Sequence, residues 1–157
     1  MFDLRELERA HEIVGQAVPP TPAHAWPLLS ERLGAHVVVK HENHTPIGAF
    51  KVRGGLVYLD RLKRERPNTP GIISATRGNH GQSLAFAAGR HGVPAVIYVP
   101  RGNSVEKNRA MRAFGAELVE HGEVLLDRIT PRHIDHRANA MTAGGEGKAL
   151  PVIAARS

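Results

Sequence analysis

Short apolar segments alternate with helical segments between residues 72 and 121, and this alternation limits the folds that the chain can adopt. The apolar segments are residues 72–75, 95–100 and 116–121, and their length and their Ile and Val content favour strands. Residues 80–90, which are rich in Ala, and a segment capped by Ser104 favour helices. Strands joined by helices through short connections form parallel sheets. We therefore expect an α/β fold with an open parallel sheet built from βαβ units.

The N-terminal part of the chain is expected to add two helices and one strand. Asp3 can cap the first helix, with an acidic residue three positions later in capping-box spacing. The proline-rich residues 19–22 follow as an extended connector, and residues 35–40 predict a short, mostly buried strand. The second helix is predicted to begin at Lys51 and to stop at Pro67.

Composition narrows the classes of function. The chain has no cysteine, which excludes disulfides and thiolate metal sites. Its net charge of +6 suits an anionic ligand, but basic and acidic residues alternate and no basic block carries interleaved aromatic residues. We therefore expect no nucleic-acid partner. The absence of a long apolar stretch and of an apolar leader segment predicts no membrane partner and a cytoplasmic location.

A lysine stands at the start of the second predicted helix, in the segment Gly-Ala-Phe-Lys-Val-Arg-Gly-Gly at residues 48–55. A lysine that reacts with a carbonyl group must be held in a fixed position, and a helix start after a turn provides one. Helix N-termini disfavour cations, so an ordinary surface lysine is less expected here than elsewhere. Lys51 is therefore a candidate catalytic residue, with a solvated surface lysine as the alternative.

A second segment, residues 74–83, spans the end of a predicted strand and the start of the next helix. Its glycines allow a ligand to approach the backbone closely, and free N–H groups at a helix start bind carboxylate or phosphate. Ligands of open parallel sheets bind at this edge, and Asn79 offers both a donor and an acceptor. An ordinary βα turn uses Gly and Asn for its geometry as well, so this segment alone leaves both interpretations open.

Together the two segments resemble the paired motifs of fold-type II pyridoxal-phosphate enzymes. Residues 48–55 resemble the lysine motif, and Arg-Gly-Asn-His-Gly-Gln at residues 77–82 resembles the second motif. The most similar group is the serine/threonine dehydratases, which include serine racemase. Weaker similarities lie at Thr21-Pro22 and within residues 99–117. Two motifs in the right order and spacing make the resemblance specific.

The resemblance implies a domain organisation. It covers about residues 1–123. Residues 1–50 would form the N-terminal part of the large domain, and residues 51–123 the small βα domain that binds cofactor and substrate. Residues 124–157 would be a tail unlike the family.

The resemblance also implies the chemistry. Lys51 would hold pyridoxal 5'-phosphate as a Schiff base, Phe50 would pack beside the cofactor, and Asn79 would hydrogen-bond to its 3′-oxygen. The substrate would bind at Ser74, Ala75, Gly78, Asn79 and His80. The implied reaction is dehydration and deamination of L-threonine or L-serine, a β-elimination that gives a 2-oxo acid and ammonia. A full-length enzyme of this kind is expected to be a homo-oligomer.

Two positions depart from the family pattern. Ala49 stands where Ser usually precedes the Phe-Lys pair. Arg77 stands where Ser or Ala is common, and a serine at that position supplies the second acid/base group of racemases. The arginine therefore favours dehydration over racemisation.

The tail, residues 124–157, loses the strand–helix alternation. Its glycine-rich residues 144–147 arrive too early for the family's phosphate loop, and residues 152–153 are only a weak apolar run. His133 and His136 lie in this tail and the other histidines are scattered, so we predict no metal site. We expect the tail to be irregular and poorly ordered, and we hypothesise that an altered reading frame produced it.

Two other interpretations stay open. The chain could be a truncated, non-catalytic fragment of such an enzyme, or a basic nucleic-acid-binding module whose binding weakens with salt. Absorbance of bound cofactor that disappears when Lys51 is replaced separates the enzyme from both.

Overall fold

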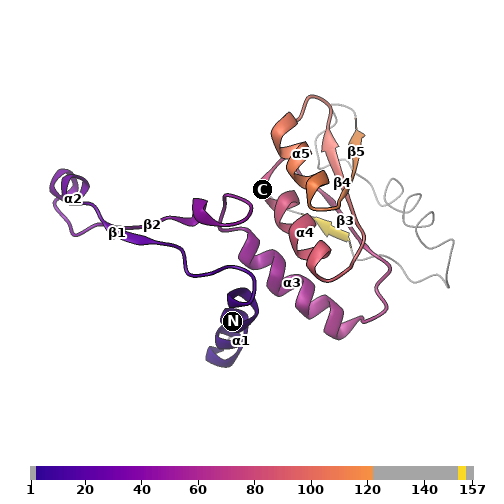
Figure 1. Ribbon diagram of the computed structural model, residues 1–157, viewed down its shortest axis with the longest axis horizontal. Coiled ribbons are helices and arrows are strands. Elements are labelled where there is room, and N and C mark those ends of the chain that lie inside the picture. The colour runs from indigo at the N-terminus through magenta and orange to yellow at the C-terminus, as the bar shows by residue number, and fades with distance from the viewer. Residues whose placement is uncertain (1–2, 122–151, 155–157) are drawn as a thin grey trace.

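A four-stranded parallel sheet forms the body of the protein in the computed structural model, which describes residues 3–121 and 152–154 (Figure 1). The strand order is β5-β4-β3-β6, and each neighbouring pair is parallel. The strands are β3 (Ile72–Ala75), β4 (Ala95–Pro100), β5 (Glu117–His121) and β6 (Val152–Ala154). The expected α/β fold with an open parallel sheet and βαβ units is confirmed.

Helices connect the strands and cover one face of the sheet. The three helices are α3 (Val52–Glu65), α4 (Asn79–Arg90) and α5 (Val105–Ala113). The main core lies between them and the sheet, where Leu59, Ile97 and Met111 are at most 1% exposed. Side chains alternate along a strand, so Ile73 and Val96 face the opposite side of the sheet and form a separate, smaller cluster.

The N-terminal segments begin with a helix that packs against α3 and continue with a part that extends away from the sheet (Figure 1). They comprise α1 (Leu4–Gly15), β1 (Ala23–Ala25), α2 (Pro27–Leu33), β2 (Val38–Lys40) and the 3-10 turn η1 (Glu42–His44). Asp3 caps α1 in the predicted capping box. β1 and β2 pair with each other as an antiparallel hairpin that projects from the body of the molecule, and α2 lies between them in the chain.

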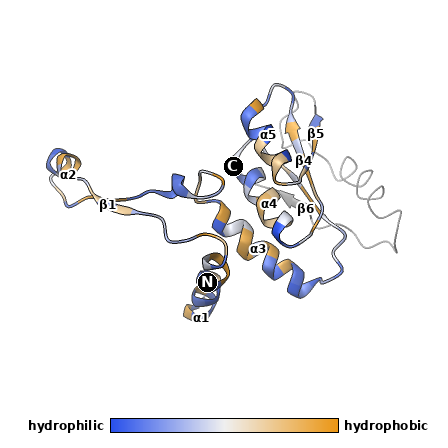
Figure 2. Cartoon of the chain, in the orientation of Figure 1, coloured by the Kyte–Doolittle hydropathy of each residue, from blue (hydrophilic) through white to orange (hydrophobic). Residues whose placement is uncertain are grey.

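The prediction of a mostly buried strand at residues 35–40 is wrong in length and in burial. Strand β2 has only three residues, and its side chains are exposed or half-buried. It pairs with β1 and not with the main sheet, so no second layer of side chains covers it. Apolar side chains of this hairpin and of α2 therefore remain exposed, among them Trp26 at 47% and Leu28 at 81%. Figure 2 shows hydrophobic residues in β1 and α2.

The prediction of an irregular tail is wrong at one place. Strand β6 pairs in parallel with β3, with Ser74 opposite Ile153. The glycine-rich residues 144–147 and the histidines at 133 and 136 lie outside the described residues. Within the described part of the chain, no helix is both long enough and apolar enough to span a membrane.

Helices α3 and α4 approach each other closely at Gly55. This glycine is buried, and a Cβ atom there would overlap Ser83 Oγ and lie 2.8 Å from the Ser83 carbonyl oxygen. The Ser83 hydroxyl donates a hydrogen bond of 2.6 Å to the Lys51 carbonyl oxygen. The close packing and the hydrogen bond together join the start of α3 to the first half of α4.

We expect Gly55→Ala to lower the free energy of unfolding by about 1–3 kcal/mol, because the added methyl group overpacks this contact. Gly54 is the matched control, since it is exposed and a Cβ atom there would meet nothing within 4 Å. Gly54→Ala should stabilise the helix by about 0.5–1 kcal/mol through backbone entropy. Urea unfolding of both variants measures the difference, and equal effects would contradict the packing argument.

Candidate functional site

Lys51 lies directly before α3 at the N-cap position, as predicted. Its backbone already has helical angles, with φ −58° and ψ −21°. The hydrogen bond from Ser83 fixes its carbonyl group, while its side chain is exposed. The lysine therefore has an anchored backbone and an accessible amine.

Lys51 lines a cavity of about 360 Å³ between α3 and α4. The cavity brings Phe50, Lys51 and His80 together, and these three residues come from the two separate sequence motifs. Phe50 is 62% exposed, which is unusual for a phenylalanine. The full lining is Phe50, Lys51, Arg53, Gly54, Gly55, Tyr58, His80 and Leu84.

His80 contributes a buried polar atom to this site. Its Nε2 atom has no hydrogen-bond partner among the described residues. Burial lowers the pKa of His80 below its usual value of 6.5, and the positive charge of Lys51 lowers the pKa further. The imidazole is therefore neutral near pH 7, and its buried Nε2 atom has no partner among the described residues.

The turn between β3 and α4 leaves the start of α4 without a side-chain cap. Gly78 is the N-cap residue and Asn79 begins the helix. The first N–H groups of a helix have no partner within it, so this end suits an anion. Ser74 is only 2% exposed and Ala75 is half-buried, which leaves the residues after them as the accessible part of the loop. The substrate roles of Ser74, Ala75, Gly78, Asn79 and His80 stay predictions.

Asn79 has a partner that the two motifs do not contain. The ammonium group of Lys107, on α5, donates a hydrogen bond of 2.8 Å to Asn79 Oδ1. No local pattern indicates this contact, because the two residues are 28 positions apart and meet only through the packing of α5 on α4.

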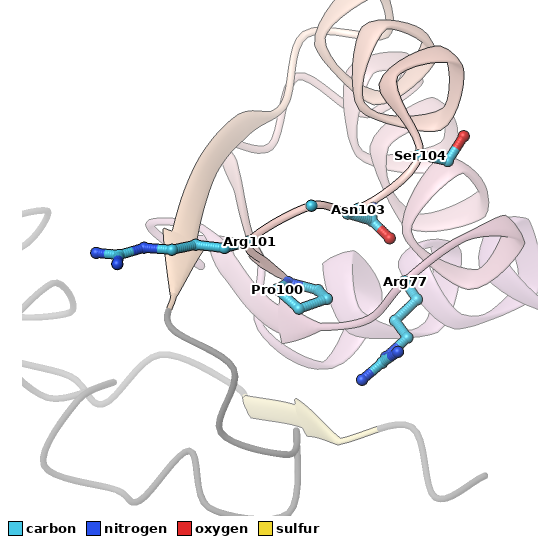
Figure 3. A pocket seen from close by; sticks show the side chains of 6 residues that line it. Arg77, Pro100, Arg101, Asn103 and Ser104 are labelled. Carbon is cyan, nitrogen blue, oxygen red and sulfur yellow. The ribbon is translucent and has the colours of Figure 1, made fainter.

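Arg77 lines a second cavity, of about 390 Å³, at the carboxyl ends of β3 and β4. Pro100, Arg101, Gly102, Asn103 and Ser104 complete its lining. The Arg77 and Arg101 side chains extend in different directions (Figure 3). Arg77 does not line the Lys51 cavity, so the structure separates it from the candidate catalytic lysine.

A charged network joins the N-terminal segments to the start of α3. Arg53 binds both carboxylate oxygens of Glu42, at 2.8 and 2.9 Å, and the Thr21 hydroxyl donates to the same carboxylate at 2.6 Å. These hydrogen bonds, chiefly the one from Arg53, lower the pKa of Glu42 to about 2. Arg53 follows Lys51 by two residues, so the network ties the start of α3, and with it the lysine, to the N-terminal segments.

The parallel sheet, with a lysine at a helix start and an uncapped βα turn beside it, is the arrangement expected of the fold-type II class. The family described as "Pyridoxal-phosphate dependent enzyme" matches residues 14–149, and the chain belongs to this family. The match runs on to residue 149, past residue 123, where the resemblance read from the motifs was expected to end.

Two curated relatives are named as threonine dehydratases. The biosynthetic L-threonine dehydratase IlvA of Escherichia coli (strain K12) is 38% identical over 119 residues, which is 76% of this chain and 23% of that protein. The protein of the same name from Lactococcus lactis subsp. lactis (strain IL1403) is 31% identical over 153 residues, 98% of this chain and 35% of that protein. The chain thus spans about a quarter to a third of these relatives.

Solved structures have the same fold. A threonine deaminase from T.th. superposes with a TM-score of 0.67 at 28% identity, covering 90% of this chain and 42% of that one. A pyridoxal 5'-phosphate-dependent aspartate racemase gives a TM-score of 0.79 at 24% identity, covering 96% of this chain and 44% of that one. At this identity the likeness supports a shared fold and no shared activity.

The described residues fit part of this cofactor. Lys51 offers an accessible amine for its aldehyde, and Phe50 offers an exposed aromatic face beside that amine. His80, whose buried Nε2 atom has no partner among the described residues, also lines this cavity. The site therefore has the groups needed to hold one end of pyridoxal phosphate.

The pKa of His80 gives a first test of the site. Lys51→Met removes a positive charge next to the imidazole, so we expect the pKa of His80 to rise towards 6.5 and to stay below it, because burial is the larger cause of the shift. The pKa is measured by NMR titration of the His80 ring protons. Lys63→Met, near the far end of α3, is the control and should leave the pKa unchanged. An unchanged value in Lys51→Met would contradict the proximity of the two side chains.

Glu42 gives a second test. Its pKa is about 2 in the folded chain against an ordinary value of 4.5, so its ionised form stabilises the fold above pH 4.5 and this contribution is lost as the pH falls towards 2. We expect Glu42→Gln to lower the free energy of unfolding at pH 7 by about 1–3 kcal/mol. The variant should also lose less stability than the wild type between pH 4.5 and 2. Glu31→Gln, at an exposed position of α2, is the control. Unfolding curves of both variants and the wild type at several pH values measure these differences, and equal effects of the two substitutions would contradict the prediction.

Proposed function

We propose that this chain is the lysine-bearing part of an enzyme that uses pyridoxal phosphate to dehydrate and deaminate L-threonine or L-serine. The observation that carries the proposal is the cavity shared by Phe50, Lys51 and His80, next to the Asn79 turn. The names of the curated relatives support threonine as a substrate. A cytoplasmic location and a homo-oligomeric full-length enzyme, with no nucleic-acid or membrane partner, belong to the same proposal.

Three residues hold the cofactor in this proposal. The Lys51 amine would bond to its aldehyde carbon, Phe50 would pack against its ring, and the Asn79 amide would donate a hydrogen bond to the ring 3′-oxygen. When bound, pyridoxal phosphate stabilises the negative charge that develops at the substrate's α-carbon.

The substrate carboxylate binds at the start of α4 in this proposal. The uncapped N–H groups that follow Gly78 are donors for it, and the helix dipole adds a favourable field. The neutral His80 lines this end of the cavity without adding a competing charge. Binding there holds the α-carbon near Lys51.

Lys51 also moves the proton. Once the amine of the substrate has taken its place, the Lys51 amine at Nζ would be free to accept the α-proton as a general base. The β-hydroxyl group would then leave as water with that proton. Hydrolysis of the unsaturated product gives the 2-oxo acid and ammonia. Threonine would yield 2-oxobutyrate and serine would yield pyruvate.

Arg77 supports elimination over racemisation. Racemisation needs a second group that gives and takes a proton on the other face of the α-carbon. A guanidinium group stays protonated at physiological pH and cannot act as that base. Arg77 also lines a different cavity from Lys51.

Cofactor attachment tests the proposal. The purified chain is mixed with pyridoxal phosphate, reduced with borohydride and digested, and the modified lysine is located by mass spectrometry. We expect the label on Lys51, together with an absorbance band that Lys51→Ala abolishes and that Lys63→Ala, on the same helix, retains. Equal labelling of several lysines, or no band, would contradict a cofactor site.

Product formation is measured on the same sample. Release of a 2-oxo acid from threonine or serine, lost in Lys51→Ala, would support the reaction. Labelling of Lys51 without product would support the cofactor site and contradict the proposed reaction for this chain.

A further inference from the structure

Lys107 reaches from α5 across the start of α4. Its side chain is half-buried, and its ammonium group lies 2.8 Å from Asn79 Oδ1. Its own backbone is held at the first turn of α5, where its N–H group donates to the Ser104 hydroxyl at 3.4 Å. The contact therefore links the caps of two successive helices.

The chemistry of lysine determines which way the Asn79 amide faces. An ammonium group has three donors and no acceptor, whereas an asparagine amide has an acceptor oxygen and an NH₂ donor. Only the oxygen of Asn79 can bind Lys107, because the reverse orientation would place donors against donors. The NH₂ group of Asn79 is therefore directed away from Lys107.

Gly78 provides the space for this arrangement. Its φ of −162° is an extended angle that any residue adopts, so its backbone does not require glycine. A Cβ atom at Gly78 would instead lie 3.0 Å from Lys107 Nζ and 3.2 Å from Lys107 Cδ. The glycine of this turn thus leaves room for the lysine side chain to cross it.

Lys107 has no acidic partner in the described part of the chain. The ion pairs there involve only lysine and arginine residues of β2 and α3. The half-buried ammonium group of Lys107 is hydrogen-bonded to a neutral amide and not to a carboxylate. Its position is therefore better explained by the orientation that it imposes on the Asn79 amide than by charge pairing.

We propose that Lys107 is a positioning residue, which holds the Asn79 amide so that its NH₂ group points to an acceptor oxygen of the ligand. The inference deepens the proposed function and rests on it for the identity of that ligand, the 3′-oxygen of pyridoxal phosphate. Lys107 does not itself contact the reacting atoms in this proposal.

Three substitutions separate the possible roles of Lys107. Lys107→Met keeps the length of the side chain and removes the donor. Lys107→Glu supplies only acceptors, so it should turn the amide and draw the NH₂ group of Asn79 away from the ligand. Arg109→Glu makes the same reversal of charge at an exposed position of α5 and controls for electrostatics.

The first measurement needs no cofactor. NMR of the Asn79 side-chain NH₂ group reports whether it is hydrogen-bonded. We expect Lys107→Glu to move these signals downfield and to slow their exchange with water, with no such change in Arg109→Glu. Unchanged Asn79 signals in Lys107→Glu would overturn the inference, whether or not the chain binds a cofactor.

The second measurement is an absorbance titration with pyridoxal phosphate. We expect affinity to fall about threefold to tenfold in Lys107→Met, as for the loss of one orienting hydrogen bond. A loss of more than about tenfold is expected in Lys107→Glu, and little loss in Arg109→Glu. Equal affinities of wild type and Lys107→Glu would overturn the inference.

The two measurements also distinguish this inference from the proposed function. If no variant and no wild-type chain binds the cofactor, the proposed function fails for this chain while the NMR result still decides the orientation of Asn79. Circular dichroism checks folding. If Lys107→Glu does not fold, Lys107→Met decides, and unchanged Asn79 signals and affinity in that variant count against the inference.

Discussion

The contact between α3 and α4 is the interaction on which the candidate site depends. Gly55 allows the two helices to touch, and the Ser83 hydroxyl binds the carbonyl group of Lys51 at 2.6 Å. Because α4 begins only four residues before Ser83, the same contact places Lys51 beside His80 and the start of α4. A change of a few tenths of an ångström between the helices would therefore move the amine relative to the groups that accompany it.

The Glu42 network constrains the same lysine through the N-terminal segments. Arg53 is the second residue of α3 and binds Glu42 through two hydrogen bonds, so the turn that precedes Lys51 cannot move independently of the helix. Packing against α4 depends on the shapes of the two helices, whereas charge pairing with Glu42 depends on the ionisation of its carboxylate. Only the second constraint therefore weakens as the pH falls and Glu42 becomes protonated.

Local sequence patterns predicted the elements that carry their own signals. The alternation of strands and helices indicated the parallel sheet, and the Asp3 capping box indicated the start of α1. Strands β1 and β6 have three residues each, which is too short for any periodicity to appear. The candidate site shows the same difference between local and tertiary signals. Sequence motifs indicated Lys51 and Asn79. Lys107 lies 28 residues from Asn79 and reaches it only through tertiary packing, so no motif indicated it.

The position of the positive charge explains why a net charge of +6 is compatible with a small anionic ligand. Arg77 and Lys107 flank the Gly78 turn, and Lys51 lies close enough to His80 to lower its pKa. None of these three cations forms an ion pair with another described residue. They add to the field of the α4 N-terminus, which favours anions. A carboxylate or phosphate bound there would neutralise charge that the fold leaves unpaired, whereas nucleic acid would need a longer basic surface.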